Sequence, residues 1–225
     1  MIKKLILSIT LFTAFLIPVS AFATTVTVSP YSGQNVDFSY TFGNKTQGWG
    51  GLIGASFSSP DFFSSAYCVD INIGLSAQSY TVEGFSDVST YNDGNYTSNS
   101  SGLNAAWLMN KYSSGLGYHD YTIGEKQASE AGLQLAIWKA LYGDSFEPVT
   151  TGSFTTSEAM VYYVDYTSDL NSADLSGFSG ENFKVAKLDG GQDLLIYDPV
   201  PEPTTLLLFG IGLLGISAIG RKRKA

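Results

Sequence analysis

Alternating apolar and polar residues predict strands along the first part of the chain. Residues 24–29 (TTVTVS) and 35–42 (NVDFSYTF) alternate in this way and are rich in β-formers, so we expect two strands there. Residues 66–75 (AYCVDINIGL) predict a third strand and residues 79–85 (SYTVEGF) a fourth. The polar stretch from Asp87 to Gly102 is typical of a loop.

Glycine marks two further features of this strand-rich part. Residues 48–54 (GWGGLIG) indicate a strand or turn in which two backbones approach closely. Ile53 stands where a dinucleotide-binding G-x-G-x-x-G pattern requires its last glycine, so that motif is excluded. Residues 183–188 and 193–197 predict a terminal hairpin around the pair Gly190-Gly191.

Helical spacing of apolar residues appears in the middle of the chain. Residues 103–112 and 125–142 have this spacing, and Gly143 follows the second segment as a stop. Gly132 within that segment indicates a break or a close contact. A Thr-Thr-Ser-Glu capping box predicts a third helix over about 158–170. The expected fold class is therefore α+β: a single main domain, residues 24–200, with a strand-rich frame and a central helical section.

The N-terminus has the three parts of a secretory signal. Lys3 and Lys4 supply positive charge, residues 5–17 form an apolar run, and Ala21-Phe22-Ala23 is an A-x-A cleavage site. We therefore expect residues 1–23 to be a signal peptide that a signal peptidase removes after Ala23. Export across a membrane follows from this prediction.

The C-terminal residues 201–225 have a different order of parts. Pro201-Glu202-Pro203 precedes residues 204–220, which carry no charge, and a basic tail follows. The tail consists of Arg221, Lys222, Arg223 and Lys224. Seventeen helical residues reach about 26 Å, enough to cross a bilayer core, so 204–220 is predicted as a transmembrane helix. The basic tail would stay in the cytoplasm during a transient insertion into the inner membrane.

This order of motif, short apolar helix and basic tail resembles the PEP-CTERM sorting signal of Gram-negative bacteria. The resemblance implies recognition by an exosortase, removal of the signal near Pro201-Glu202-Pro203 and transfer of the protein to the cell surface or extracellular matrix. Proteins of this kind accompany exopolysaccharide and biofilm loci. Biofilm association and contact with exopolysaccharide are therefore further expectations.

Charge and reactive residues narrow the possible functions of residues 24–200. This part holds six lysines, no arginine and 19 acidic residues, a net charge of −13. Such a domain does not attract nucleic acid by electrostatics. A single His and a single Cys in the chain argue against a zinc site and an internal disulfide. We expect no metal and no cofactor.

The lone Cys68 of an exported chain needs an explanation, and three are open. It is a buried small hydrophobic residue, or it pairs with another molecule, or its thiol reacts with an internal partner other than cysteine.

The pair Tyr67-Cys68 and the run Gln134-Leu135-Ala136-Ile137-Trp138 resemble motifs of bacterial surface thioester domains. In that family a Cys after an aromatic residue joins the Gln of a T-Q-x-A-I/V-W motif. Here Leu133 replaces the Thr.

The resemblance spans about residues 66–142 and implies a Cys68–Gln134 thioester. Tyr67, Ala136, Ile137 and Trp138 would form its surroundings. The thiolate attacks the carboxamide carbon and ammonia leaves. An amine of a target then attacks the thioester, which leaves an amide at Gln134 and a free thiol at Cys68. This is a single covalent attachment, not enzymatic turnover. The rival interpretation is a structural or adhesive matrix protein with an unreacted, buried Cys68.

Three weaker constellations complete the candidates. His119 would make a Cys–His pair if the fold placed it beside Cys68, but an exposed loop histidine is the simpler interpretation. Asp189 and Asp193 would suit a glycosidase, or they form a solvated hairpin end. The tyrosines of residues 162–166 either stack on sugars or lie half in the core and half on the surface.

Overall fold

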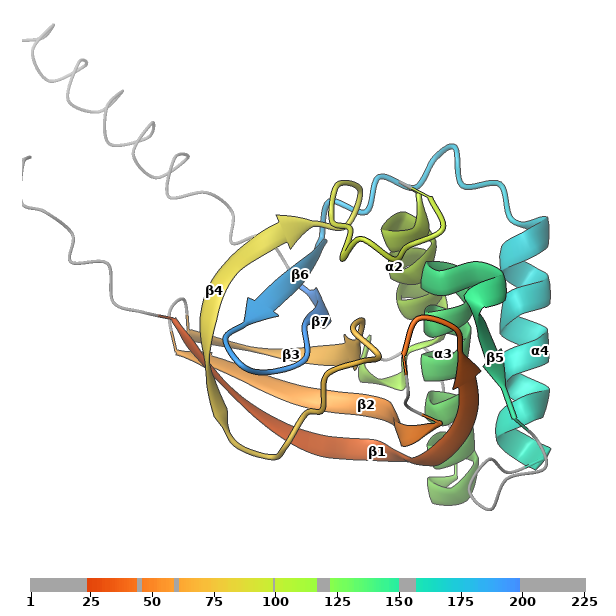
Figure 1. Ribbon diagram of the computed structural model, residues 1–225, viewed down its shortest axis with the longest axis horizontal. Coiled ribbons are helices and arrows are strands. Elements are labelled where there is room, and N and C mark those ends of the chain that lie inside the picture. Colours follow the sequence, from red (N-terminus) through yellow and green to blue (C-terminus); the bar gives the residue numbers. More distant parts are fainter. Residues whose placement is uncertain are drawn as a thin grey trace, which may run out of the picture.

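The computed structural model describes residues 24–43, 46–58, 61–98, 100–116, 122–149 and 157–198. Within them, seven strands and three α-helices form one α+β domain (Figure 1). The strands are β1 (Thr25–Tyr40), β2 (Gln47–Ser58), β3 (Asp61–Cys68), β4 (Ser79–Asp87), β5 (Phe146–Pro148), β6 (Phe183–Leu188) and β7 (Leu194–Tyr197). The helices are α2 (Ser101–Tyr112), α3 (Ile123–Tyr142) and α4 (Ser157–Ser172), with short 3-10 turns at Ser114–Leu116 and Gly143–Ser145.

Six strands close into a ring. The sheet order is β2-β3-β7-β6-β4-β1-β5, and β1 also pairs with β2, so the ring closes and β5 extends it along the end of β1. All pairings between these described strands are antiparallel. Side chains that alternate along β1, such as Val26, Val28, Val36 and Phe38, point inward and are buried. The ring therefore encloses part of the apolar core.

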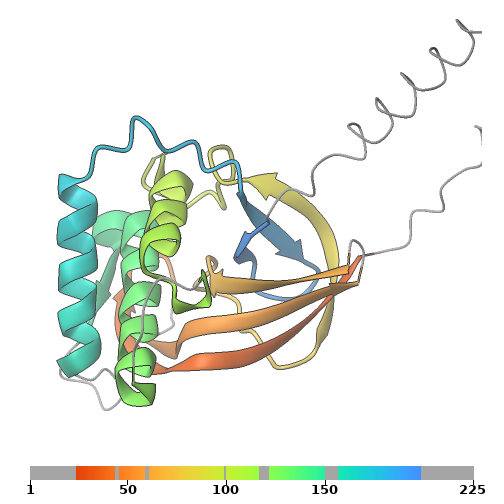
Figure 2. The same ribbon diagram turned by 180° about the vertical axis from the view of Figure 1, so that it is seen from behind.

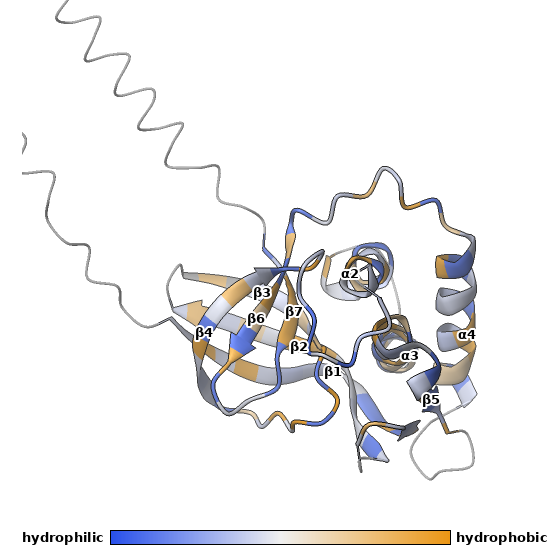
Figure 3. Cartoon of the chain, turned by 45° about the horizontal axis from the view of Figure 1, so that its top comes forward, coloured by the Kyte–Doolittle hydropathy of each residue, from blue (hydrophilic) through white to orange (hydrophobic). Residues whose placement is uncertain are grey.

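Helix α3 lies in the middle of the domain. α2 and α4 cover it on two sides, and β1 and β2 cover it on another (Figures 1 and 2). Every residue from 128 to 138 is buried, so the helix has no solvent-facing stripe over three turns. Figure 3 shows the same helix surrounded by the other elements. A polar side chain in this stretch must find its hydrogen-bond partner inside the protein.

Two close backbone approaches explain glycines of the sequence. Gly33 of β1 pairs with Gly51 of β2, and a Cβ on Gly33 would lie 2.3 Å from the carbonyl oxygen of Gly50. In α3, a Cβ on Gly132 would lie 2.7 Å from the carbonyl oxygen of Ala159 in α4. The predicted close approaches at both places are confirmed, and α3 continues through Gly132 without a break.

Most predicted elements are present, and two strand predictions are wrong. The segments 24–29 and 35–42 belong to one strand, β1, because a register shift between Pro30 and Ser32 lets it continue past the proline. The strand predicted over 66–75 ends at Cys68, since an Asp70–Asn72 turn follows it. The hairpin of β6 and β7 is confirmed, and Gly190 takes a positive φ of 67° in its turn.

The predicted targeting segments lie outside the described residues. These are the signal peptide 1–23, with cleavage after Ala23, and the sorting region 201–225 with its helix 204–220. Thr155 and Thr156 of the predicted capping box lie outside them too. No α-helix in the described part of the chain combines the length and apolarity needed to span a bilayer.

Candidate functional site around Cys68 and Gln134

Cys68 is the last residue of β3 and lies in the core. It is buried, with 4% of its surface exposed, and it forms no disulfide. On one side β3 pairs with β7 through Cys68 and Leu194. On the other side the pairing of β3 with β2 ends earlier, at Ala66 and Ile53. The main chain of Cys68 therefore needs a partner other than β2.

Gln134 of α3 supplies that partner. The Cys68 amide donates to the Gln134 Oε1 atom at 3.0 Å. The Gln134 Nε2 atom donates to the Cys68 carbonyl oxygen at 2.8 Å. Gln134 is completely buried, so this amide has no access to water. The two residues, 66 positions apart in sequence, are held side by side.

A second polar cluster fixes β3 against α3 one helical turn before Gln134. The Tyr67 hydroxyl donates to the Glu130 carboxylate, and Ser114 donates to the same carboxylate through its amide and its hydroxyl. The Tyr67 hydroxyl oxygen also lies 2.9 Å from Ser113 Oγ, within hydrogen-bond distance, and with its own proton directed to Glu130 it accepts from the Ser113 hydroxyl. Burial raises the pKa of Glu130, although the hydrogen bonds from Ser114 and Tyr67 oppose that rise. Burial and the Glu130 charge raise the pKa of Tyr67 well above its usual value. Glu130 and Gln134 lie on the same face of α3, one turn apart. The cluster around Glu130 therefore helps to hold Gln134 opposite Cys68.

The segment after Cys68 is held by polar contacts as well. The Tyr142 hydroxyl, at the end of α3, donates to the Val69 carbonyl oxygen at 2.7 Å. Gln192 donates through Nε2 to the Asp70 carbonyl oxygen. Burial raises the pKa of Asp70, and the nearby charges of Asp93 and Asp193 add to that rise. These contacts hold the chain on both sides of the cysteine.

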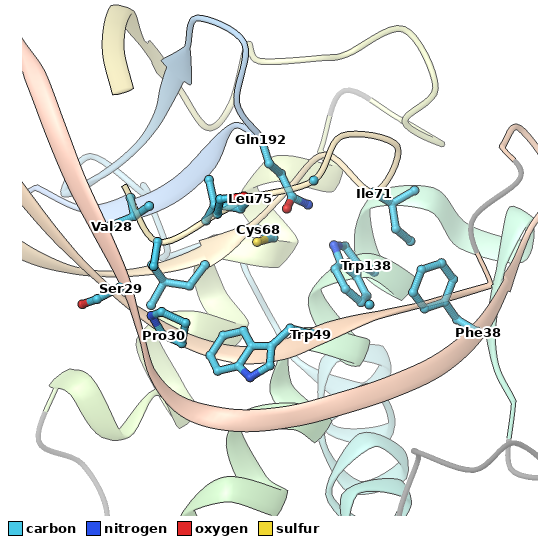
Figure 4. Close-up of a pocket in the computed structure, with 15 residues that line it drawn as sticks. Val28, Ser29, Pro30, Phe38, Trp49, Cys68, Ile71, Leu75, Trp138 and Gln192 are labelled. Carbon is cyan, nitrogen blue, oxygen red and sulfur yellow. The ribbon is translucent and has the colours of Figure 1, made fainter. Parts of the chain in front are cut away.

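A cavity of about 230 Å³ lies beside Cys68 (Figure 4). Cys68 is part of its wall, between the apolar side chains of β1, the segment after β3 and helix α3. Its lining includes the apolar side chains of Val28, Phe38, Trp49, Ile71, Leu75 and Trp138, and the polar side chain of Gln192. None of the described residues that line the cavity is charged. The cysteine therefore borders a small apolar space.

Trp138 follows Gln134 by one helical turn and forms part of the cavity wall. Its ring packs against Phe38, with 5.3 Å between the ring centroids, and against Phe146 at 5.7 Å. The indole Nε1 is buried and has no hydrogen-bond partner among the described residues. Ala136 and Ile137 are completely buried in the core of α3. Of the two aromatic residues in the predicted surroundings of the thioester, Trp138 borders the cavity, whereas Tyr67 binds Glu130.

The weaker candidates take different places. His119 lies outside the described residues. Asp193 accepts hydrogen bonds from Tyr91 and from the Leu188 amide, while Asp189 is exposed at the hairpin end. Tyr163 and Tyr166 of α4 are buried and Tyr162 is half-buried, which confirms the division between core and surface. Among the described residues, no group of three or more His, Cys, Asp or Glu side chains is placed to hold a metal ion.

Glu130, Gln192 and the cavity were not found from the sequence. The spacing of four residues between Glu130 and Gln134 places them on one helix face, but their burial depends on how the helices pack. Gln192 lies in a hairpin turn that gives no sequence signal of its contact with Asp70. The cavity is formed by segments far apart in the chain.

Comparison with known proteins identifies the end of the chain. Residues 199–224 match the PEP-CTERM protein-sorting motif. The chain carries a PEP-CTERM sorting motif. This motif supports export and sorting by an exosortase as a cell-surface protein of a Gram-negative bacterium. No curated protein and no solved structure matched the chain.

Proposed function

We propose that this PEP-CTERM protein carries an internal Cys68–Gln134 thioester and attaches through it, once, to an amine at the cell surface or in the extracellular matrix. The observation that supports the proposal most is the pair of hydrogen bonds between the Gln134 carboxamide and the Cys68 main chain. They hold the electrophile beside the residue that carries the nucleophile. An amide is a poor electrophile, so such preorganisation is needed for attack.

The surroundings favour each step of this chemistry. When the Cys68 sulfur attacks the Gln134 carbonyl carbon, negative charge develops on Oε1, which already accepts the Cys68 N–H at 3.0 Å. A C–S bond forms, the C–N bond breaks, and the leaving nitrogen takes the thiol proton to become ammonia. The apolar, buried setting limits hydrolysis of the product. The attachment consumes the thioester, so the protein is not an enzyme.

The sorting motif gives this chemistry a location. Removal of the signal peptide and of the segment after Pro201-Glu202-Pro203 would leave residues 24–200 outside the inner membrane. Attachment to an amine of the surface or matrix would then retain the protein there. A role beside exopolysaccharide in a biofilm belongs to the same proposal.

One observation favours a second function. The same two hydrogen bonds satisfy main-chain groups of Cys68 that β2 leaves unpaired, so Gln134 also has a purely structural use. In that case the protein is a non-enzymatic structural or adhesive matrix component with an unreacted cysteine.

Intact mass of the mature protein separates the two functions. We expect a mass one ammonia below the sequence mass, and a Cys68 that resists thiol reagents after unfolding. Treatment with methylamine should form an amide at Gln134 and free the thiol. Cys68→Ala and Gln134→Ala should abolish both effects, while Gln78→Ala, at an exposed glutamine, should keep them. Full sequence mass with a freely alkylated Cys68 would falsify the thioester.

A further inference from the structure

We propose that the cavity beside Cys68 is the site that receives the amine, and that it selects a primary amine at the end of an unbranched aliphatic chain. This inference rests on the proposed thioester and specifies its substrate class. A lysine side chain and a free alkylamine both have this chemistry.

Burial of the reacting atoms sets the shape of the substrate. Gln134 is completely buried, and Cys68 exposes 4% of its surface. The thioester carbon would be bonded to the Cys68 sulfur, which borders the cavity, so the cavity gives access to it. At about 230 Å³ the cavity is smaller than pockets for drug-sized ligands, which begin at roughly 300 Å³. Only a slim chain with the amine at its tip meets these conditions.

The lining sets the polarity of that chain. Val28, Ile71, Leu75 and the rings of Trp49 and Trp138 offer apolar contact to methylenes. Because no described lining residue is charged, a second ammonium group on the substrate would lose its hydration without gaining an ion pair. The reacting amine must enter in its neutral form. It then attacks the carbonyl carbon, the C–S bond breaks, and the proton of the amine passes to the released Cys68 thiolate.

Trp138 adds an aromatic surface to the apolar wall of the cavity, where Figure 4 shows its indole beside Phe38. The two rings pack with 5.3 Å between their centroids. The indole Nε1 atom is buried and has no hydrogen-bond partner among the described residues, so the indole offers the cavity its apolar ring atoms. Contact of the methylenes with this ring favours an aliphatic chain over a polar one.

The test measures rates of covalent adduct formation on the full mature protein by intact mass. The amines are methylamine, n-butylamine, tert-butylamine, 1,4-diaminobutane and Nα-acetyl-lysine methylamide. We expect n-butylamine to exceed methylamine by at least tenfold, because each buried methylene contributes roughly fourfold. The branched amine and the diamine should react more slowly than n-butylamine by a similar factor. A rapid reaction of the lysine derivative would identify peptide-borne lysine as a source, and a slow one would restrict the site to free alkylamines.

A charge placed in the wall gives an independent test. Leu75 is half-buried in the lining, so Leu75→Glu would supply an ion-pair partner for a second ammonium group. The ratio of the diamine rate to the n-butylamine rate should rise at least fivefold in Leu75→Glu relative to Leu75→Gln, which has the same shape without the charge.

The outcomes separate this inference from the thioester itself. If methylamine adds to Gln134 but chain length, branching and charge make no difference, the cavity does not select the amine and the inference is overturned. If no amine adds and the protein has its full sequence mass, the thioester is absent and both proposals fail. The amine panel on the unmodified protein decides the question even if a Leu75 variant does not fold.

Discussion

The side-chain amide of Gln134 takes, on the main chain of Cys68, the place that a neighbouring strand would occupy. β2 stops pairing with β3 at Ala66, and Gln134 continues the hydrogen bonding from helix α3. These two hydrogen bonds connect helix α3 to the end of strand β3. They contribute to the stability of the domain and, under the proposed function, they hold the reacting side chains together.

Replacement of Gln134 by alanine should destabilise the domain in either function, but for different reasons. If Cys68 is unreacted, two of its buried main-chain groups lose their Gln134 partners, at about 1–3 kcal/mol each, and we expect a loss of about 2–6 kcal/mol in the free energy of unfolding, measured by urea denaturation. If the thioester has formed, the Gln134 nitrogen has already left as ammonia, and the variant loses the crosslink instead. A loss within about 0.5 kcal/mol would contradict the hydrogen-bonding role.

Cys68→Ala, the companion variant, keeps both main-chain hydrogen bonds, so its cost reports on the side chain alone. Loss of a buried sulfur from an unreacted cysteine should cost about 1 kcal/mol. A crosslink between residues 66 positions apart would add about 4 kcal/mol, by analogy with a disulfide loop of that length. Native protein opened with methylamine should lose that crosslink contribution without any mutation.

The buried Glu130 should give the stability of the domain a specific pH dependence. Its folded-state pKa is raised above the ordinary value of 4.5, with burial as the main cause. The folded state therefore binds this proton more tightly than the unfolded state. The contribution of Glu130 to stability is fully present below the unfolded pKa and is lost as the pH rises through the folded pKa.

Glu130→Gln removes this titration. The difference in unfolding free energy between Glu130→Gln and the native protein should shift in favour of the variant as the pH rises from about 4 to 7. Urea denaturation of both proteins at several pH values measures this difference, and the other acidic groups cancel in the comparison. A constant difference, or a shift in favour of the native protein, would show that the pKa of Glu130 is not raised.

The predicted signal peptide, with its Ala21-Phe22-Ala23 cleavage site, and the sorting motif together predict processing at both ends of the chain. The mature protein should begin at Thr24 and lack the basic tail, Arg221 to Lys224. Terminal sequencing and mass measurement of protein from the producing cells test this. Alanine replacement of Pro201-Glu202-Pro203 should leave the protein at the inner membrane, and an extracellular protein that retains its tail would contradict exosortase processing.

The sequence predicted the presence of helices and strands better than where the strands begin and end. Helix α3 was predicted almost to its ends because its apolar run, late Lys139 and stop at Gly143 are local signals. The sequence did not predict that β1 is one continuous strand, because a proline such as Pro30 normally ends a strand. Only the register shift beside Pro30 allows the strand to continue. The start of β3 was missed too, because Ser64 and Ser65 are typical of loops although both are buried here.

Within the candidate site, motifs gave the residues but not their contacts. The strand and helix that carry Cys68 and Gln134 were predicted, yet the main-chain role of the Gln134 amide depends on where β2 stops pairing. Glu130 looked like an ordinary acidic residue early in a helix. Its burial follows from α3 being covered on all sides, which no local pattern reveals.

The packing of the central helix leads to the last prediction, on two glycines of α3. A Cβ on Gly132 would lie 2.6 Å from the Tyr162 Cβ and 2.7 Å from the Ala159 carbonyl oxygen, so Gly132→Ala must push α4 away. We expect a loss of about 1–3 kcal/mol in unfolding free energy. Gly124→Ala is the matched control in the first turn of the same helix, where a new Cβ meets nothing within 4 Å. There the gain in helix propensity should leave stability unchanged or raise it by up to about 1 kcal/mol. Equal effects at the two positions would contradict the close contact between α3 and α4.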